Sequence, residues 1–174
     1  MARRNGINPH VSVLVIACVS FVCASQAAYA RLGETEAELE KRFGPPYFKQ
    51  EPLIETEPGD KCLHYQKDGI QVMVMFWKGQ SIREDYEFRG QIEGESLKKA
   101  AAIVEANANG QVLEQPANPR ALNPNLKHGW NTVDGEMFAY IYVNSPDTLN
   151  IVSRSYMAER DRRTKAAKSG AGGF

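Results

Sequence analysis

The feature that most constrains the fold is a pair of Asp-Gly dipeptides, Asp68-Gly69 and Asp134-Gly135, which lie 66 residues apart. This dipeptide readily adopts the two-residue turn with positive φ that joins two antiparallel strands in a hairpin. Patterns typical of strands flank each copy, at residues 63–66 and 70–77 in the first and at 128–133 and 137–143 in the second. The chain is therefore predicted to contain two similar β-hairpins.

A short helix is predicted ahead of the first hairpin. Thr35 is a suitable N-cap residue, and Glu38, three residues later, completes a capping box. Leu39 and Phe43 lie four residues apart, so they share the buried face of this helix. The sequence Gly-Pro-Pro at 44–46 ends it.

The same order of elements then follows around the second hairpin. A helix is predicted at 96–108, and connectors broken by proline, at 47–60 and 111–127, separate each helix from its hairpin. Each hairpin continues into a further strand, at 81–88 and 148–155. In the first of these strands, one face is expected to carry Ile82, Tyr86 and Phe88.

This repeated order is interpreted as an internal duplication. A gapless alignment after the turns places Ile70, Val72, Val74 and Phe76 against Glu136, Phe138, Tyr140 and Tyr142. The predicted fold class is α+β, with tandem units that each combine a helix with an antiparallel β-meander. The predicted boundaries are 31–92 for the first unit, 93–156 for the second and 157–174 for a polar helix and flexible tail.

Residues 1–30 have the pattern of a secretory signal peptide. Arg3 and Arg4 precede an apolar run from Val11 to Cys23, and the segment ends in Ala28-Tyr29-Ala30, with small residues where a signal peptidase requires them. The mature chain is therefore expected to begin at Arg31 and to be periplasmic or secreted. Two alternatives are an uncleaved anchor and a lipid anchor at Cys18, where Val-Ile-Ala-Cys loosely fits a lipobox.

Signal removal leaves a small, weakly charged chain without a disulfide. The precursor has 21 basic and 21 acidic residues, and loss of Arg3 and Arg4 makes these 19 and 21. No basic excess indicates a nucleic-acid partner, and no stable membrane span remains. Cys62 is the one cysteine after residue 30, so the fold must depend on apolar burial alone.

The motif Leu-Gly-Glu-Thr at 32–35, followed by Arg-Phe-Gly-Pro-Pro at 42–46 and by Asp-Gly-Ile at 68–70, resembles a group of uncharacterised exported bacterial proteins. The order of helix, Gly-x-Pro and antiparallel meander is also similar to small envelope proteins of the BamE/SmpA type. The duplication resembles that of β-lactamase inhibitor protein. These resemblances imply a non-catalytic, protein-binding α+β module, and they transfer no functional residue.

Candidates for chemistry are few. Cys62 and His64 lie two residues apart on a predicted strand and so share a face; with His128 they could form a three-ligand metal site. No metal-binding spacing accompanies them, so structural roles are favoured and neither a metal nor another cofactor is expected. The same Cys-His pair could supply a thiol nucleophile, but no helix N-terminus lies beside it to lower the thiol pKa.

Two pairs of carboxylates that are close in the sequence do not fit glycosidase chemistry. That chemistry needs two carboxylates at a fixed separation across a cleft, whereas neighbours on a strand point to opposite faces. Glu84, Asp85, Glu55 and Glu57 are therefore interpreted as ordinary surface acids. No Gly-x-Ser-x-Gly motif is present, and the chain is expected not to be an enzyme.

One predicted strand is unusually apolar. Residues 70–77 are apolar on both faces, with Ile70, Val72, Val74 and Phe76 on one and Met73, Met75 and Trp77 on the other. The second hairpin repeats this, with Phe138, Tyr140 and Tyr142 opposite Met137, Ala139, Ile141 and Val143. The second face is either buried between the two units or presented to a partner.

The functional hypothesis is a non-enzymatic binding or structural module of the bacterial envelope. Its expected contact face comprises Met73, Met75 and Trp77, and its partner is a protein or a second copy of the chain. The alternative is a metal- or thiol-dependent enzyme using Cys62, His64 and His128. The polar helix predicted from Met157 to Lys168 is expected to be solvated, with docking of an acidic partner as the alternative.

Overall fold

The computed structural model describes residues 31–52, 57–116, 118, 123–142 and 147–170. Within them, eight strands form one antiparallel sheet in the order β1-β2-β3-β4-β8-β7-β6-β5. The strands are β1 Phe48–Gln50, β2 Lys61–Lys67, β3 Ile70–Trp77, β4 Gln80–Glu87, β5 Leu113–Glu114, β6 Leu126–Thr132, β7 Met137–Tyr142 and β8 Thr148–Ser153. The predicted signal segment, Glu55 and the last four residues of the tail lie outside the described residues.

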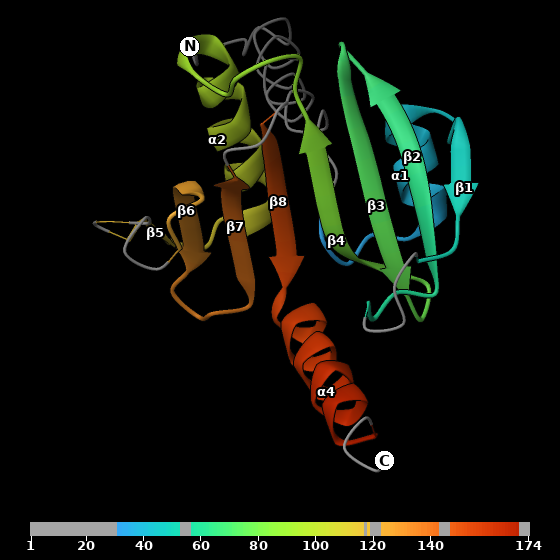
Figure 1. Ribbon diagram of the computed structural model, residues 1–174. Coiled ribbons are helices and arrows are strands. Elements are labelled where there is room, and N and C mark those ends of the chain that lie inside the picture. The colour runs from blue at the N-terminus through green and yellow to red at the C-terminus, as the bar shows by residue number, and fades with distance from the viewer. Residues whose placement is uncertain (1–30, 53–56, 117, 119–122, 143–146, 171–174) are drawn as a thin grey trace, which may run out of the picture.

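Three helices accompany the sheet in the described part of the chain: α1 Glu36–Phe43, α2 Gly94–Ala108 and α4 Arg154–Gly170. The α+β class is thus confirmed. In Figure 1, α1 lies behind β2 and α2 lies behind β7 and β8, on the same face of the sheet, whereas α4 projects beyond the end of β8.

The two meanders, β2-β3-β4 and β6-β7-β8, join edge to edge. β4 and β8 pair in antiparallel register from Arg83 opposite Val152 to Glu87 opposite Thr148. Because the two halves form one continuous sheet, their faces do not stack on each other. Burial of the second apolar face between two units, one of the two readings of the sequence, is therefore wrong.

The face beneath α1 and α2 holds the main core. Ile70, Val72, Val74 and Phe76 of β3 lie in it, as the alternation predicted. The helices contribute apolar side chains that are completely buried, among them Leu39, Ala100, Ile103 and Val104. Such burial contributes roughly 1.5–3 kcal/mol for each large apolar side chain.

Local signals at α1 are confirmed. The Glu38 carboxylate accepts hydrogen bonds from the Thr35 backbone N–H and hydroxyl, both at 2.8 Å, which completes the capping box. Leu39 is buried, Phe43 packs partly buried against the same core, and Gly44 ends the helix with φ of +82°.

The two Asp-Gly turns differ from each other. Asp68 and Gly69 both have positive φ, 51° and 78°, as a two-residue turn between β2 and β3 requires. In the second hairpin only Gly135 has positive φ, because a longer loop joins Thr132 to Met137. The Met137 backbone N–H donates to the Thr132 hydroxyl at 3.1 Å and closes this loop.

The longer loop changes which side chains face the helices. Met137, Ala139 and Ile141 lie in the same core as β3's Ile70 and Val72. Phe138 and Tyr140 lie in the cluster on the opposite face. The gapless alignment is therefore wrong by one residue.

Two further details of the strands were not predicted correctly. Ile82 belongs to the cluster opposite the helices, whereas Tyr86 and Phe88 lie beneath them, because the pairing of β3 with β4 shifts between Met75 and Phe76. The two proline-broken connectors also contain short edge strands, β1 and β5.

Candidate binding face

The sheet surface opposite α1 and α2 is named the open face. Two rows of paired residues cross it from β2 to β7. One row is Cys62, Met75, Arg83, Val152 and Phe138; the other is His64, Met73, Asp85, Asn150 and Tyr140. The open face therefore combines apolar side chains from both halves of the chain with a polar centre on β4 and β8.

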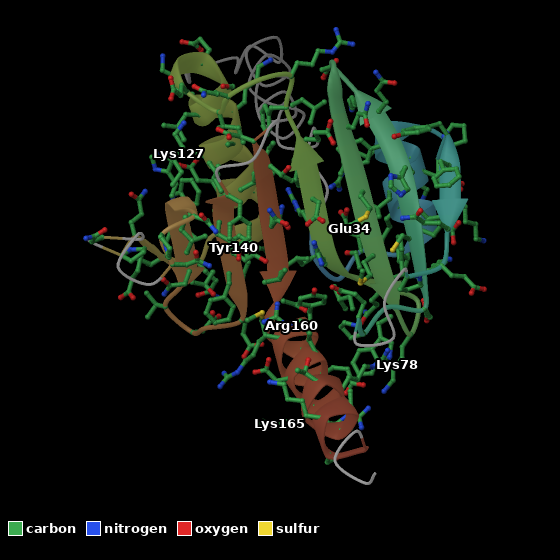
Figure 2. All side chains as sticks on the ribbon, viewed as in Figure 1. Glu34, Lys78, Lys127, Tyr140, Arg160 and Lys165 are labelled. Carbon is green, nitrogen blue, oxygen red and sulfur yellow. The ribbon has the colours of Figure 1, made fainter. Side chains whose placement is uncertain are left out.

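The apolar residues of the open face are only partly covered. Met73, Trp77, Phe138, Tyr140 and Met157 are half-buried and pack around a small buried cluster. Figure 2 looks directly onto this face, with Tyr140 on β7 turned toward the viewer's side of the sheet. These side chains form one partly exposed apolar group, to which β3, β7 and the first turn of α4 contribute.

Met75 is an exception to the predicted contact face. Its side chain is 3% exposed, because the segment before β2 lies over it. A Cβ at Gly59 would come within 2.4 Å of Met75 Cγ and 3.2 Å of the Phe76 carbonyl oxygen, so glycine is needed for this close approach. The predicted face thus retains Met73 and Trp77 but not Met75.

Arg83 forms the polar centre of the open face. Its Nε and Nη2 donate to the two carboxylate oxygens of Asp85 at 3.0 and 2.7 Å. Its Nη1 donates to the Tyr156 hydroxyl at 2.8 Å and lies 3.3 Å from a Glu57 oxygen. This bidentate geometry fixes the guanidinium in the plane of the Asp85 carboxylate.

Burial acts on the pKa of both charged groups of the central pair, Arg83 and Asp85. Burial raises the pKa of Asp85, and Arg83 only partly offsets that effect. For Arg83, burial opposes the charge, but Asp85, Tyr156 and Glu57 outweigh burial and raise the pKa of the guanidinium. Arg83 is thus held charged and fully engaged, so it serves as a structural anchor rather than a free anion-binding group.

The same cluster attaches α4 to the sheet. The Tyr156 hydroxyl donates to Glu57 Oε2 at 2.7 Å, and Tyr156 is 1% exposed. Two turns further on, Arg163 donates to the Glu57 carbonyl oxygen at 2.5 Å and to the Pro58 carbonyl oxygen at 3.3 Å. The first turns of α4 are therefore packed, which corrects the expectation of a wholly solvated helix.

Beyond this attachment α4 is basic and exposed. Residues 154–170 contain six basic and two acidic residues. Lys165 and Lys168 are exposed, and Arg160 and Lys165 project from the helix below the sheet in Figure 2. At the same end of the sheet, the Lys78 ammonium lies 4.3 Å from the centre of the Trp77 ring. Positive charge thus borders one end of the open face.

The structure does not bring together the three residues of the alternative site, Cys62, His64 and His128. Cys62 and His64 lie on β2 on the open face, whereas His128 pairs with Ile141, on the helix-covered face. Five strand spacings separate β2 from β6, which corresponds to about 24 Å. Among the described residues, no group of three His, Cys, Asp or Glu side chains could hold a metal ion.

The surroundings of Cys62 and His64 favour structural roles over chemical ones. Cys62 is 2% exposed, and burial raises the pKa of its thiol to about 11, which disfavours the nucleophilic thiolate. His64 packs against Phe48 and Tyr47, with ring centroids 5.3 and 6.1 Å away. Burial lowers the pKa of His64, and its buried Nε2 has no hydrogen-bond partner within the described residues.

The interpretation of the acidic residues as surface acids is wrong for β4. Glu84 and Asp85 point to opposite faces, as expected, but Glu84 is completely buried beneath α2. It accepts hydrogen bonds from Tyr86 Oη at 2.8 Å and Asn107 Nδ2 at 3.3 Å. Burial raises the pKa of Glu84 to about 7, against the opposing effect of these two donors.

Two hollows lie away from the open face. One, of about 170 Å³, lies between α1, α2 and the sheet and is bordered by Phe43, Tyr86, Lys67 and Lys99. The other, of about 280 Å³, lies at the end of the sheet and is lined mainly by polar residues of both halves, including Ser81 and Asn107. Neither contains the residues proposed from the sequence.

Sequence reasoning missed Arg83, Tyr156 and Asn150. A signal was present for one contact, since Arg83 and Asp85 lie two residues apart on a predicted strand and therefore share a face. Tyr156 and Asn150 join the cluster through the pairing of β4 with β8, which no local pattern reveals. None of the described helices is both long and apolar enough to cross a membrane.

No protein-family model matches the chain, and no curated protein matches it. Among solved structures, the chain is similar to a cysteine-rich secretory protein from Staphylococcus aureus, with a TM-score of 0.44 and 13% sequence identity. The alignment covers 73% of this chain and 44% of that one, so this chain spans less than half of that protein's length. This weak likeness carries no argument about function.

Proposed function

We propose that this chain is an exported, non-enzymatic binding module whose open face contacts a protein partner. The observation that carries the proposal is the partly exposed apolar group of Met73, Trp77, Phe138, Tyr140 and Met157. The opposite face of the sheet is covered by two helices, whereas these five side chains are left half-covered. Methionine and large aromatic residues of this kind are enriched in protein interfaces.

The charge around the open face favours a partner with an acidic surface. Lys78 and the exposed basic residues of α4 border the end of the face that carries Trp77 and Met157. Arg83 holds α4 in this place through Tyr156, so the basic border is fixed relative to the apolar group. Complementary charge at the rim increases the association rate and selects the partner, while the apolar centre supplies most of the affinity.

The finer features of the proposal come from the sequence. Cleavage after Ala30 would make the module periplasmic or secreted, and lipid attachment at Cys18 is the alternative. The resemblance to BamE/SmpA-type envelope proteins and to β-lactamase inhibitor protein is consistent with a module that binds proteins. The tandem units, 31–92 and 93–156, also remain part of this proposal.

The test compares open-face variants with a matched exposed apolar position. Trp77→Lys and Phe138→Lys are expected to abolish a specific cross-link in the envelope and to weaken binding of the purified partner at least tenfold. Val133→Lys is the control, because Val133 is 61% exposed, lies in the β6–β7 loop and is not one of the side chains of the apolar group. Binding that tolerates both open-face changes would contradict the proposal.

Further measurements distinguish an acidic partner, a second copy of the chain and the enzyme alternative. An acidic partner predicts that affinity falls as salt concentration rises, because screening weakens the contacts of α4 and Lys78. Sedimentation of the purified chain tests for a second copy: a dimer that Trp77→Lys dissociates would overturn the acidic-partner proposal in favour of self-association. Retention of metal by the wild-type chain but not by Cys62→Ala/His64→Ala would instead favour the enzyme alternative.

A further inference from the structure

The segment 31–34 is held by hydrogen bonds to both halves of the molecule. Gly33 N donates to the Ser81 carbonyl oxygen at 2.8 Å, and Ser81 N donates to the Glu34 carbonyl oxygen at 2.9 Å. Leu32 N donates to Asn107 Oδ1 of α2 at 2.9 Å. The start of the predicted mature chain is therefore tied to β4 and α2.

A tight turn directs the backbone nitrogen of Arg31 toward a carboxylate. Glu34 N donates to the Arg31 carbonyl oxygen at 3.2 Å, and Gly33 has φ of +88°, as the third position of a type II turn requires. Arg31 N lies 3.1 Å from Glu34 Oε2. The Arg31 carbonyl oxygen also accepts a hydrogen bond from the Ser81 hydroxyl at 3.0 Å, which fixes the turn.

Glu34 is a partly buried ion-pair partner. Arg42 of α1 donates to both Glu34 oxygens, and the two side chains are each 14% exposed. Arg31 itself carries a second cation, its guanidinium, and three further carboxylates lie in this region. Glu84 of β4 interacts electrostatically with Glu34 and Arg42, and Asp134 and Glu136 line the same hollow as Leu32 and Gly33.

We propose that the cleavage expected from the sequence, which would make Arg31 the first residue, creates a structural cation at the Arg31 backbone nitrogen. A signal peptidase would add water across the bond, leaving a carboxylate on Ala30 and an α-ammonium on Arg31. That ammonium would replace the neutral amide 3.1 Å from Glu34 and would form a second ion pair beside Arg42. The processed domain thereby gains stability that the precursor lacks. This inference rests on the export part of the proposed function.

Processing and ion pairing are tested in sequence on the naturally exported protein. The full gene is expressed, the processed protein is purified, and mass spectrometry identifies its first residue. Arg31 is the expected result, and any other first residue would overturn the inference. The open face takes no part in this test, so its outcome is distinct from that of partner binding.

The ion pair is then tested by neutralising the amine. Selective acetylation of the α-amine of the processed protein is expected to lower the folding equilibrium constant roughly three- to tenfold at pH 6, which equals a shift of about half to one pKa unit. Glu34→Gln should remove this effect of acetylation. An equal effect in wild type and Glu34→Gln would overturn the inference.

The pH dependence gives a check that needs no variant. An α-amine that gains a carboxylate partner has a raised pKa in the folded state. Its contribution to stability is therefore complete below the unfolded value, about 7.7–8.0, and is lost as pH rises through the folded value. NMR titration of the Arg31 amine should give a pKa above this range, and an unshifted or lower pKa would contradict the proposed pair.

Discussion

Replacement of Arg83 by methionine tests whether the polar centre holds the open face together. The change keeps most of the side-chain length but removes two hydrogen bonds to Asp85, at 3.0 and 2.7 Å, and one to the Tyr156 hydroxyl at 2.8 Å. Arg83 and Asp85 are 20% and 14% exposed, so the Asp85 carboxylate would remain largely buried without its cation. Breaking such a pair costs about 3 kcal/mol or more.

The assay is urea unfolding followed by tryptophan fluorescence. With an m-value of roughly 2 kcal/mol/M, a loss of about 3 kcal/mol lowers the urea midpoint by about 1.5 M. The matched control is Arg154→Met, which removes an ion pair with Glu136 in which both side chains are more than 60% exposed. Because exposed pairs contribute little, the control is expected to change the midpoint by less than about 0.5 M.

The pH dependence identifies the cause of the loss. Burial already raises the pKa of Asp85, and removal of Arg83 raises it further. Because the folded state then binds a proton more tightly than the unfolded state, the penalty is largest at pH 7 and shrinks as pH falls. At pH 5 less than half of the loss should remain, and the double change Arg83→Met/Asp85→Asn should recover most of it at pH 7. A loss below about 1 kcal/mol, or one independent of pH, would refute the reasoning.

Three smaller predictions follow from burial and close contact. Cys62, whose thiol pKa is raised to about 11, should react with a maleimide at least about 100-fold more slowly in the folded than in the unfolded chain, because a buried thiol is poorly ionised. Glu84 has a folded pKa of about 7 against an ordinary 4.5, so stability should fall as pH rises between these values, by an amount on the order of 3 kcal/mol, and Glu84→Gln should abolish this slope in urea titrations. Gly59→Ala should destabilise the fold by about 1–3 kcal/mol through its clash with Met75, whereas Gly129→Ala, whose nearest contact is 3.4 Å, should have a smaller effect; equal effects would contradict the contact argument.

The sequence predicted the elements whose determinants are local. Thr35 and Glu38 define the start of α1, and Asp68-Gly69 defines the first turn, because both depend on residues within four positions. The faces of β3 were correct for the same reason, since its alternation follows directly from the two-residue turn. These elements needed no knowledge of the rest of the chain.

The errors arose where distant residues decide the structure. Asp134-Gly135 lies in a longer loop, closed by Thr132, and this one-residue difference reversed the predicted faces of β7. The edge-to-edge pairing of β4 with β8 joins residues more than 60 positions apart, so the continuous sheet could not be read from local patterns. The same holds for Gly59, which covers Met75 from a connector.

In the candidate site, too, the local features were predicted and the features that depend on distant residues were not. Met73 and Trp77 were found because a strand that is apolar on both faces is visible in the sequence. Arg83 was missed and Asp85 was taken for a surface acid, because charged residues on a strand are usually solvated. Their burial here depends on Tyr156 of α4 and on the segment at Glu57, which no local pattern reveals. The open face is thus built from a predictable apolar strand and an unpredictable polar anchor.

The measurement that tests the open face most directly is site-specific photo-cross-linking in cells that express the full-length chain. A photoreactive side chain at Tyr140, half-buried on the open face, is predicted to yield one discrete protein conjugate that Trp77→Lys abolishes. The same group at Lys98, exposed on α2, should yield no such conjugate. Equal cross-linking from both positions, or a Tyr140 conjugate unaffected by Trp77→Lys, would contradict a role for the open face in binding.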